Sequence, residues 1–287
     1  MKPLIDTNGS TKIPELLDGW ESWLATHRAQ HTVADYRQIL HRFFDRPEVA
    51  AIGLMEIQYA VMQEFCNASH LKRSSRNVHV WAFRSFYKFC TLAGVTKQDP
   101  SGLLNVATRD MPIDRMETHH HEAMTEDEYA RIVTSTAAPW PDFAVLSYCC
   151  GLRLVDCCTF EWGSFTGDQI VVFPTKTRGA GNRVALPVSD PLIARPELVA
   201  LLARLRVTPH GEERFVWPAL ADTYWNASRG SLPTGFIRAM KPLGITKTFH
   251  SLRTAFARRL EADGRNLWEI ARAMGHSSTA TTKIYLG

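Results

Sequence analysis

The chain has 287 residues, of which 45% are hydrophobic and 22% charged, with a formal net charge of +4. This length exceeds the usual size of one domain, and the apolar fraction is enough for packed cores, so we expect two domains and exclude a disordered chain. No run of about 18 apolar residues occurs, and the first six residues lack the pattern of a secretion signal, so we expect a soluble, cytoplasmic protein that does not enter membranes. The mildly basic balance suits a polyanionic partner without identifying one.

Residues 12–106 are predicted to form a helical domain. Apolar residues spaced three and four apart, with polar turns between the runs, predict helices over 13–26, 32–44, 55–68 and 75–94. In the second and fourth helices the apolar positions form a stripe that we expect to be buried. These positions are Val33, Tyr36, Ile39, Leu40 and Phe43, then Val78, Trp81, Phe83, Phe86 and Phe89.

Positive charge gathers on other positions of this domain. The candidate DNA-binding residues are Arg37, Lys72, Arg73, Arg76, Arg84 and Lys88. Solvated basic faces are ordinary on helices, so this pattern alone leaves both a nucleic-acid surface and a plain solvated face open.

Residues 107–122 are predicted to be a linker, because they contain few periodic apolar positions. The triplet His119–His121 lies in this polar stretch, and a solvated linker explains it better than a metal site. Thr125 and Glu128 have the spacing of a capping box, which predicts the first helix of a second domain over 123–287.

The second domain is predicted to be α+β, and the whole chain mainly α with a small β-sheet. Helical sequence flanks Gly151, and β-rich runs over 169–173 and 183–187 predict a hairpin or a three-stranded sheet. Helical periodicity returns from residue 196 onward, with one stripe ending at Gly275. Ser277 or Ser278 is placed to cap a short last helix that carries Tyr285.

The six cysteines, at positions 66, 90, 149, 150, 157 and 158, form no C-x-x-C pair. They fall within apolar sequence, and nearby histidines that would complete a zinc site are absent. We therefore expect buried thiols rather than a metal cluster.

Arginine, histidine, lysine and tyrosine residues of the second domain occur in an order that suits phosphodiester chemistry. Two guanidinium groups can clamp the oxygens of a phosphate under attack, and the candidates are Arg153 and Arg253. His250 precedes Arg253 by three residues, so both side chains reach one helical face. This set predicts a DNA strand transferase that needs no metal ion.

Each remaining side chain has a predicted role in the reaction. Tyr285 is the nucleophile, and because a free phenol has a pKa of about 10 it needs a base, His250, and a positive field. Lys176, in the loop of the hairpin, is the predicted general acid for the leaving deoxyribose oxygen. His276 is predicted to donate a hydrogen bond to the phosphate. Arg178 and Arg183 share the loop of Lys176, so the register of that loop leaves the assignment open.

The whole chain resembles the tyrosine recombinases, also called the phage integrase family. The stretch 151–156 matches the first arginine box, with Asp156 at the position of a supporting acidic residue, and Lys176 matches the β-hairpin lysine. His250–Arg253 matches the H-x-x-R box, and residues 274–285 match the terminal box with the second histidine and the nucleophile. The N-terminal helices resemble the core-binding, SAM-like domain of the family.

The resemblance implies a DNA-binding domain over 12–106 and a catalytic domain over 123–287 that together grip duplex DNA. It implies a covalent 3′-phosphotyrosine intermediate, strand exchange through a Holliday junction, and a homotetramer on paired recombination sites that is a monomer or dimer when free. Arg178 and Arg183 join the predicted DNA contacts. No cofactor is implied.

Relatives commonly carry a further helix after the nucleophile, whereas this sequence stops at Gly287. Either the chain is a shortened form or this protein assembles differently from its relatives. For a shortened form we expect DNA binding and cleavage with weakened tetramer assembly. Two other functions remain open: a non-catalytic DNA-binding regulator on the same scaffold, and a type IB topoisomerase-like activity. The target sequence, and the choice between integration, excision, inversion and dimer resolution, do not follow from the sequence.

Overall fold

The computed structural model describes residues 13–28, 30–52, 54–68, 73–96, 99–104, 122–175, 183–225 and 230–286. The chain divides into two compact units, residues 1–114 and 115–287. The predicted linker and His119–His121 lie outside the described residues except for Glu122, so the predicted domain boundaries stay predictions. Among the helices of the described ranges, none is long and apolar enough to cross a membrane.

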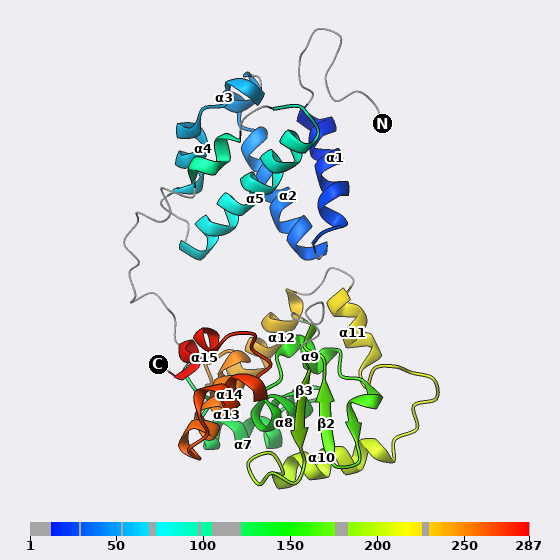
Figure 1. Cartoon of the computed structure of the whole chain (residues 1–287). Helices are drawn as coiled ribbons and strands as arrows, with labels where there is room; N and C mark the ends of the chain where they lie inside the picture. Colours follow the sequence, from blue (N-terminus) through cyan, green and yellow to red (C-terminus); the bar gives the residue numbers. More distant parts are fainter. Residues whose placement is uncertain are drawn as a thin grey trace. The chain divides into compact units, whose positions relative to one another are not determined.

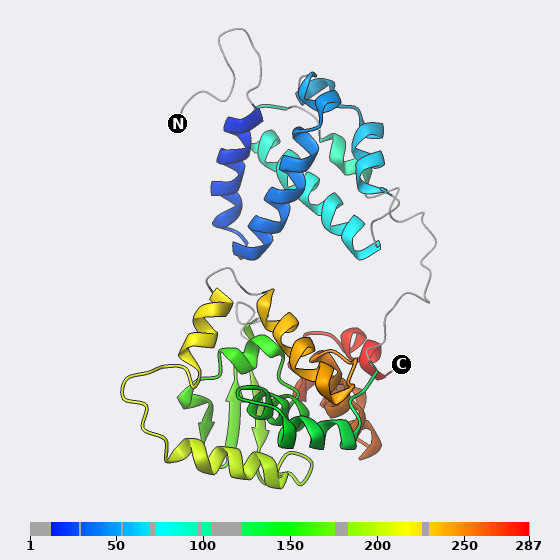
Figure 2. The same cartoon turned by 180° about the vertical axis from the view of Figure 1, so that it is seen from behind.

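The first unit is helical throughout its described part. Its elements are α1 (Ile13–Ala25), α2 (Gln30–Phe44), α3 (Pro47–Ala50), η1 (Leu54–Glu56), α4 (Tyr59–Cys66), α5 (Arg73–Leu92) and η2 (Pro100–Leu103). Helices α1, α2 and α5 pack against one another, as the two opposite views in Figures 1 and 2 show. The helices predicted from periodicity are thus confirmed, although the third is shorter than predicted and the short helix α3 was not foreseen.

Aromatic side chains fill the core of this unit. The rings of Phe43 and Phe83 meet edge to face with centroids 4.8 Å apart. Trp20 is fully buried, and its indole N–H donates to Ser85 Oγ at 3.0 Å. The prediction of a buried stripe is wrong for Val78 and Trp81, which are 40% and 60% exposed. Trp81 stands two residues from Phe83, about 200° around the helix, so one of the two must face away from the core.

The second unit contains helices and one small sheet. Its elements are α7 (Glu126–Ser135), α8 (Trp140–Cys150), α9 (Leu154–Cys158), η4 (Trp162–Ser164), β1 (Phe165–Thr166), β2 (Gln169–Val172), β3 (Val184–Pro187), α10 (Pro196–Arg206), α11 (Pro218–Trp225), α12 (Ser231–Met240), η6 (Lys241–Leu243), α13 (His250–Ala262), α14 (Leu267–Ala273) and α15 (Thr279–Leu286). The strands form an antiparallel sheet in the order β1-β2-β3, with Ile170 opposite Leu186. The predicted fold class, mainly α with a small sheet, is confirmed.

Helix α8 is the centre of this unit. Every residue from Phe143 to Cys150 is buried, because α7, α10 and α13 all pack against the helix (Figure 1). A helix covered on all sides has no polar face, which explains why this stretch is apolar apart from Ser147. All six cysteines of the chain are buried, as predicted, and burial raises the pKa of the Cys149 thiol to about 11.

The end of α8 places the first arginine box. Gly151 ends the helix in the left-handed region, at φ +65°, which L side chains rarely adopt. The chain then turns sharply, so that Arg153 stands at the N-cap position of α9. The predicted helix break at Gly151 is confirmed, and it directs Arg153 toward the buried face where α13 lies.

Candidate active site

Arg253 lies at the centre of the candidate site. It projects from the first turn of α13 and is only 2% exposed. Its Nη1 donates to the carbonyl of Gly151, and its Nη2 donates to the carbonyl of Met274. The guanidinium therefore ties together the ends of α8 and α14, two segments far apart in the sequence.

Burial and the nearby positive charge of Arg153 lower the pKa of Arg253 to about 10, while Tyr285 and Asp156 act in the opposite direction. Arg253 thus stays charged at neutral pH. Its Nε and the Nη1 of Arg153 are buried N–H donors that have no hydrogen-bond acceptor in the described part of the chain. Two buried donors of this kind suit an anionic oxygen that approaches from outside.

Arg153 is supported by a carboxylate. Asp156, 2% exposed, places Oδ2 3.8 Å from Arg153 Nη1, and its Oδ1 accepts the backbone N–H of Thr175 at 2.8 Å. Asp156 thereby connects α9 to the chain just before Lys176. This geometry is consistent with the supporting role predicted for Asp156, which remains a prediction.

The two histidines and the tyrosine of the predicted set meet around Arg253. The rings of His250 and His276 lie 5.0 Å and 5.1 Å, centroid to centroid, from the ring of Tyr285. The Arg253 guanidinium carbon is 5.8 Å from the same ring. Tyr285 is half-buried on α15, which packs against α13 and α14. The structure therefore brings Arg153, His250, Arg253, His276 and Tyr285 into one site.

The turn between α14 and α15 positions His276 and Tyr285. Gly275 has φ +63°, and a Cβ there would lie 2.7 Å from Val184 Cγ2, so a glycine is needed for close approach to β3. Ser278 Oγ accepts the backbone N–H of Ala280 at 3.2 Å at the start of α15. The predicted serine cap is confirmed at Ser278.

Part of the predicted set cannot be placed. Lys72, Lys176 and Arg178 lie outside the described residues, as does the side chain of Arg73. Arg183 is described and exposed, just before β3. It lines a cavity of about 320 Å³ together with Trp268, Arg272 and His276. Arg183 and His276 thus line the same cavity.

Two of the candidate DNA-binding arginines of the first unit make contacts within that unit. Arg37 Nε pairs with Glu21 at 3.2 Å, and Arg84 Nη2 reaches the carbonyl of Gly102 at 3.4 Å. Lys88 is exposed and Arg76 half-buried. Contact with DNA by any of these residues stays a prediction.

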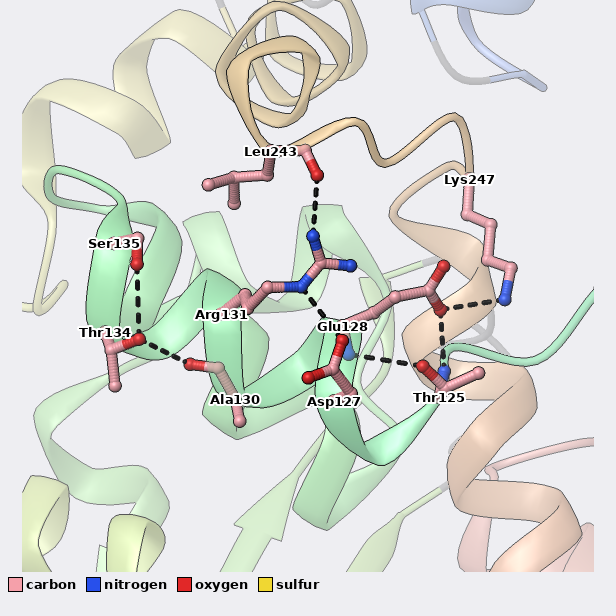
Figure 3. A network of polar contacts seen from close by, with 9 residues as sticks. All are labelled: Thr125, Asp127, Glu128, Ala130, Arg131, Thr134, Ser135, Leu243 and Lys247. Atoms are coloured by element: carbon pink, nitrogen blue, oxygen red, sulfur yellow. Dashed lines mark hydrogen bonds and ion pairs between the residues drawn. The ribbon is translucent and has the colours of Figure 1, made fainter.

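The start of α13, which carries His250, is held by the first residues of the second unit. Lys247 Nζ is 2.8 Å from Glu128 Oε2, as Figure 3 shows. It also donates to the carbonyl of Ala123 at 2.9 Å. Glu128 also accepts the backbone N–H of Thr125 at 2.8 Å, which confirms the predicted capping box. Arg131 adds a bond to the carbonyl of Leu243 at 2.8 Å. Helix α7 thus fixes the segment that leads into His250.

Replacing Lys247 by methionine is expected to lower the free energy of unfolding by about 2 kcal/mol at neutral pH, because it leaves the largely buried Glu128 carboxylate without its cation. Burial alone would raise the pKa of Glu128, but hydrogen bonds from Lys247 and Thr125 outweigh it and lower that pKa. Burial alone would lower the pKa of Lys247, but Glu128 and Glu122 outweigh it and raise that pKa.

A carboxylate with a depressed pKa stabilises the fold above its unfolded pKa of about 4.3 and loses this contribution as the pH falls through the folded value. An ammonium with a raised pKa stabilises the fold below about 10.4 and loses this contribution above it. The free energies of unfolding of wild type and Lys247→Met are measured in urea across this pH range. Their difference should be constant near neutral pH and should shrink toward both low and high pH. A difference that does not change with pH would contradict this account, and Lys241→Met, at an exposed position, is the control.

One residue of the site was missed by the sequence analysis. Thr282 is fully buried, and its Oγ1 lies 2.8 Å from His276 Nδ1. Its spacing, three residues before Tyr285 on the same helix, was an available signal that it faces the site. The carbonyls of Gly151 and Met274 were also missed, because backbone acceptors leave no mark in a sequence.

The assembled side chains define what the site can do. Two guanidinium groups can hold an anion with three or more oxygens, and a phenol stands beside two imidazoles that can accept or donate a proton. Within the described ranges, no group of three or more His, Cys, Asp or Glu side chains is arranged to hold a metal ion. The groups present thus suit phosphate binding and nucleophilic attack by the phenol.

Comparison with known families agrees with this arrangement. Residues 122–287 match the phage integrase family, and residues 17–94 match the phage integrase N-terminal SAM-like domain. The first match covers more than half of the chain. This chain belongs to the phage integrase family.

Among curated proteins, the chain is similar to the tyrosine recombinase XerC of Anoxybacillus flavithermus, with 23% identity over 90% of this chain and 87% of the relative. It is also similar to the tyrosine recombinase XerD of Brucella suis, with 24% identity over 90% of this chain and 86% of that protein.

Among solved structures, a lambda integrase dimer bound to a COC′ core site superposes with a TM-score of 0.70, at 21% identity over 97% of this chain and 78% of that one. A lambda integrase tetramer bound to a Holliday junction superposes with a TM-score of 0.68, at 19% identity over 96% of this chain and 77% of that one. At these identities the superpositions establish the shared fold.

Proposed function

We propose that this chain is a site-specific DNA recombinase that cleaves and rejoins strands through a covalent 3′-phosphotyrosine at Tyr285. The observation that carries the proposal is the meeting of Tyr285, His250 and His276 around the buried guanidinium of Arg253. Membership of the phage integrase family and similarity to tyrosine recombinases support the same activity.

In the proposed reaction, Arg153 and Arg253 bind the non-bridging oxygens of the scissile phosphate. Their buried N–H groups without an acceptor in the described chain are the donors for this contact. Both guanidinium groups also stabilise the charge that develops on phosphorus-bound oxygen, so their contribution grows in the transition state.

Tyr285 Oη attacks phosphorus as its proton passes to His250, and the P–O bond to the 5′ oxygen breaks. The leaving oxygen takes a proton from Lys176, which gives a free 5′-hydroxyl and a phosphotyrosine. The reverse reaction with a 5′-hydroxyl from another strand exchanges the partners. Because the phosphotyrosine conserves the phosphodiester energy, we propose that no metal ion or other cofactor takes part.

The proposed partner is duplex DNA that carries a specific recombination site. Exposed Trp81 and Lys88 lie seven residues apart on α5, hence on one face of that helix, which offers the first unit a surface for DNA. The lambda integrase structures hold a dimer on a core site and a tetramer on a Holliday junction, which supports a homotetramer on paired sites for this chain. Cytoplasmic action on DNA belongs to the same proposal.

The proposal is tested by trapping the covalent intermediate. Duplexes that bind the protein are selected from a random-sequence pool, and nicked versions are offered so that the short cleaved strand diffuses away. Wild type is expected to form a denaturant-resistant protein–DNA adduct, whereas Tyr285→Phe binds the same duplex and forms none. Binding without an adduct would favour a non-catalytic regulator, and relaxation of supercoils regardless of sequence would favour a topoisomerase.

A further inference from the structure

His276 is held on both ring nitrogens. Its Nε2 is 3.0 Å from Arg253 Nη2, and its Nδ1 is 2.8 Å from Thr282 Oγ1. Thr282 has no exposed surface, and Arg253 is 2% exposed. His276 itself is half-buried, so each contact is shielded from water on the side of the buried partner, where a mismatched donor or acceptor is costly.

The chemistry of these partners decides which nitrogen carries the proton. A guanidinium has five N–H donors and no acceptor, so His276 Nε2 must offer its lone pair to Arg253. One of the two Nη2 hydrogens is used by the Met274 carbonyl, and the other points to His276. The proton of a neutral ring then sits on Nδ1, which donates to the hydroxyl oxygen of Thr282.

We propose that Thr282 is a positioning residue: by accepting the hydrogen bond from Nδ1–H it completes the tautomer that Arg253 requires of His276 and fixes the orientation of the ring, and so holds the guanidinium of Arg253 in place for the phosphate. The catalytic part of this inference rests on the proposed function. The hydrogen bonds of His276 to Arg253 and Thr282 do not depend on that function. In this tautomer His276 orients Arg253, and donation from Nε2 to a phosphate oxygen requires a second proton on the ring.

The position of Thr282 also connects His276 to the nucleophile. Thr282 and Tyr285 lie three residues apart on α15, so they share one side of that helix. A movement of α15 that displaces Tyr285 also displaces the hydroxyl that holds His276. His276 is therefore held in its orientation only when α15, the helix of Tyr285, is packed against the site.

Three variants test the contact. Thr282→Val keeps the shape of the side chain and removes the oxygen, Thr282→Ser keeps the oxygen, and Thr281→Val makes the same chemical change on an exposed neighbour. The primary readout is the ¹⁵N NMR spectrum of the imidazole nitrogens in histidine-labelled full-length protein without DNA, with His276 assigned by its loss in His276→Gln.

Wild type, Thr282→Ser and Thr281→Val are expected to show His276 protonated at Nδ1. Thr282→Val is expected to lose this preference, because an Nδ1–H without its acceptor lets the ring turn away from Arg253. In the cleavage assay on a nicked duplex, Thr282→Val should slow adduct formation about tenfold with unchanged DNA affinity, and Thr282→Ser should restore it. An Nε2-protonated ring in wild type, or an unchanged ring in Thr282→Val, would overturn the proposal. If the spectra are as expected but the wild-type protein does not cleave DNA, the proposed function is overturned, whereas the contact between Thr282 and His276 is supported.

Discussion

Replacing Arg253 by lysine is expected to reduce the rate of strand cleavage by about 10²–10³-fold. The guanidinium donates at once to the carbonyls of Gly151 and Met274 and to His276 Nε2. An ammonium on a flexible stem cannot reproduce this planar fork and still meet a phosphate. The measurement is single-turnover adduct formation on a nicked duplex, at a temperature where both proteins are folded.

The matched control is Arg258→Lys, on the same helix but at an exposed position where the arginine pairs with Glu261 at 3.4 Å. It should cleave at the wild-type rate. The lysine variant at position 253 should also melt at a lower temperature, because a buried carbonyl left without a donor costs about 1–3 kcal/mol. If Arg253→Lys cleaved at the same rate as the control, Arg253 would have no part in the reaction.

The second large effect is expected at Gly151. Its φ of +65° disfavours any L side chain, and a Cβ there would overlap the ring of Phe256, which is fully buried on α13. Gly151→Ala should therefore lower the free energy of unfolding by about 2–5 kcal/mol, as the sum of left-handed backbone strain and overpacking. Denaturant unfolding of the full chain measures it.

Gly244→Ala separates the two causes. Gly244 has the same φ of +65°, and a Cβ added there would meet no atom of the described chain within 4 Å, so only backbone strain of about 1–2 kcal/mol is expected. Because Phe256 and Arg253 share α13, relief of the clash at Gly151 should also move Arg253 and slow cleavage. Equal destabilisation by the two alanines would show that the contact with Phe256 does not matter.

Much of the site was predictable because its side chains stand in short local patterns. Arg153 follows a helix-ending glycine, His250 and Arg253 share a helical face, and Ser278 caps the helix of Tyr285; each is a matter of a few residues. Local periodicity also predicted most helices and both strands of the hairpin.

What depends on tertiary packing was not predictable. Trp81 is apolar, yet only the docking of α1 and α2 onto α5 decides that Phe83 is buried and Trp81 exposed. The spacing of Thr282 from Tyr285 indicates the side of the helix on which it lies, but its contact with His276 exists only once the turn at Gly275 folds His276 back against it. Lys247 and Glu128 are 119 residues apart in sequence, and their pairing follows from the folding of α7 against the segment that precedes α13.

The central claim is that the hydroxyl of Tyr285 becomes bonded to phosphorus. Its most direct test is peptide mass spectrometry of the trapped adduct after nuclease and protease digestion. We predict a nucleotide attached through its 3′-phosphate to the peptide that contains Tyr285. A nucleotide on another residue, or attachment through a 5′-phosphate, would contradict the account.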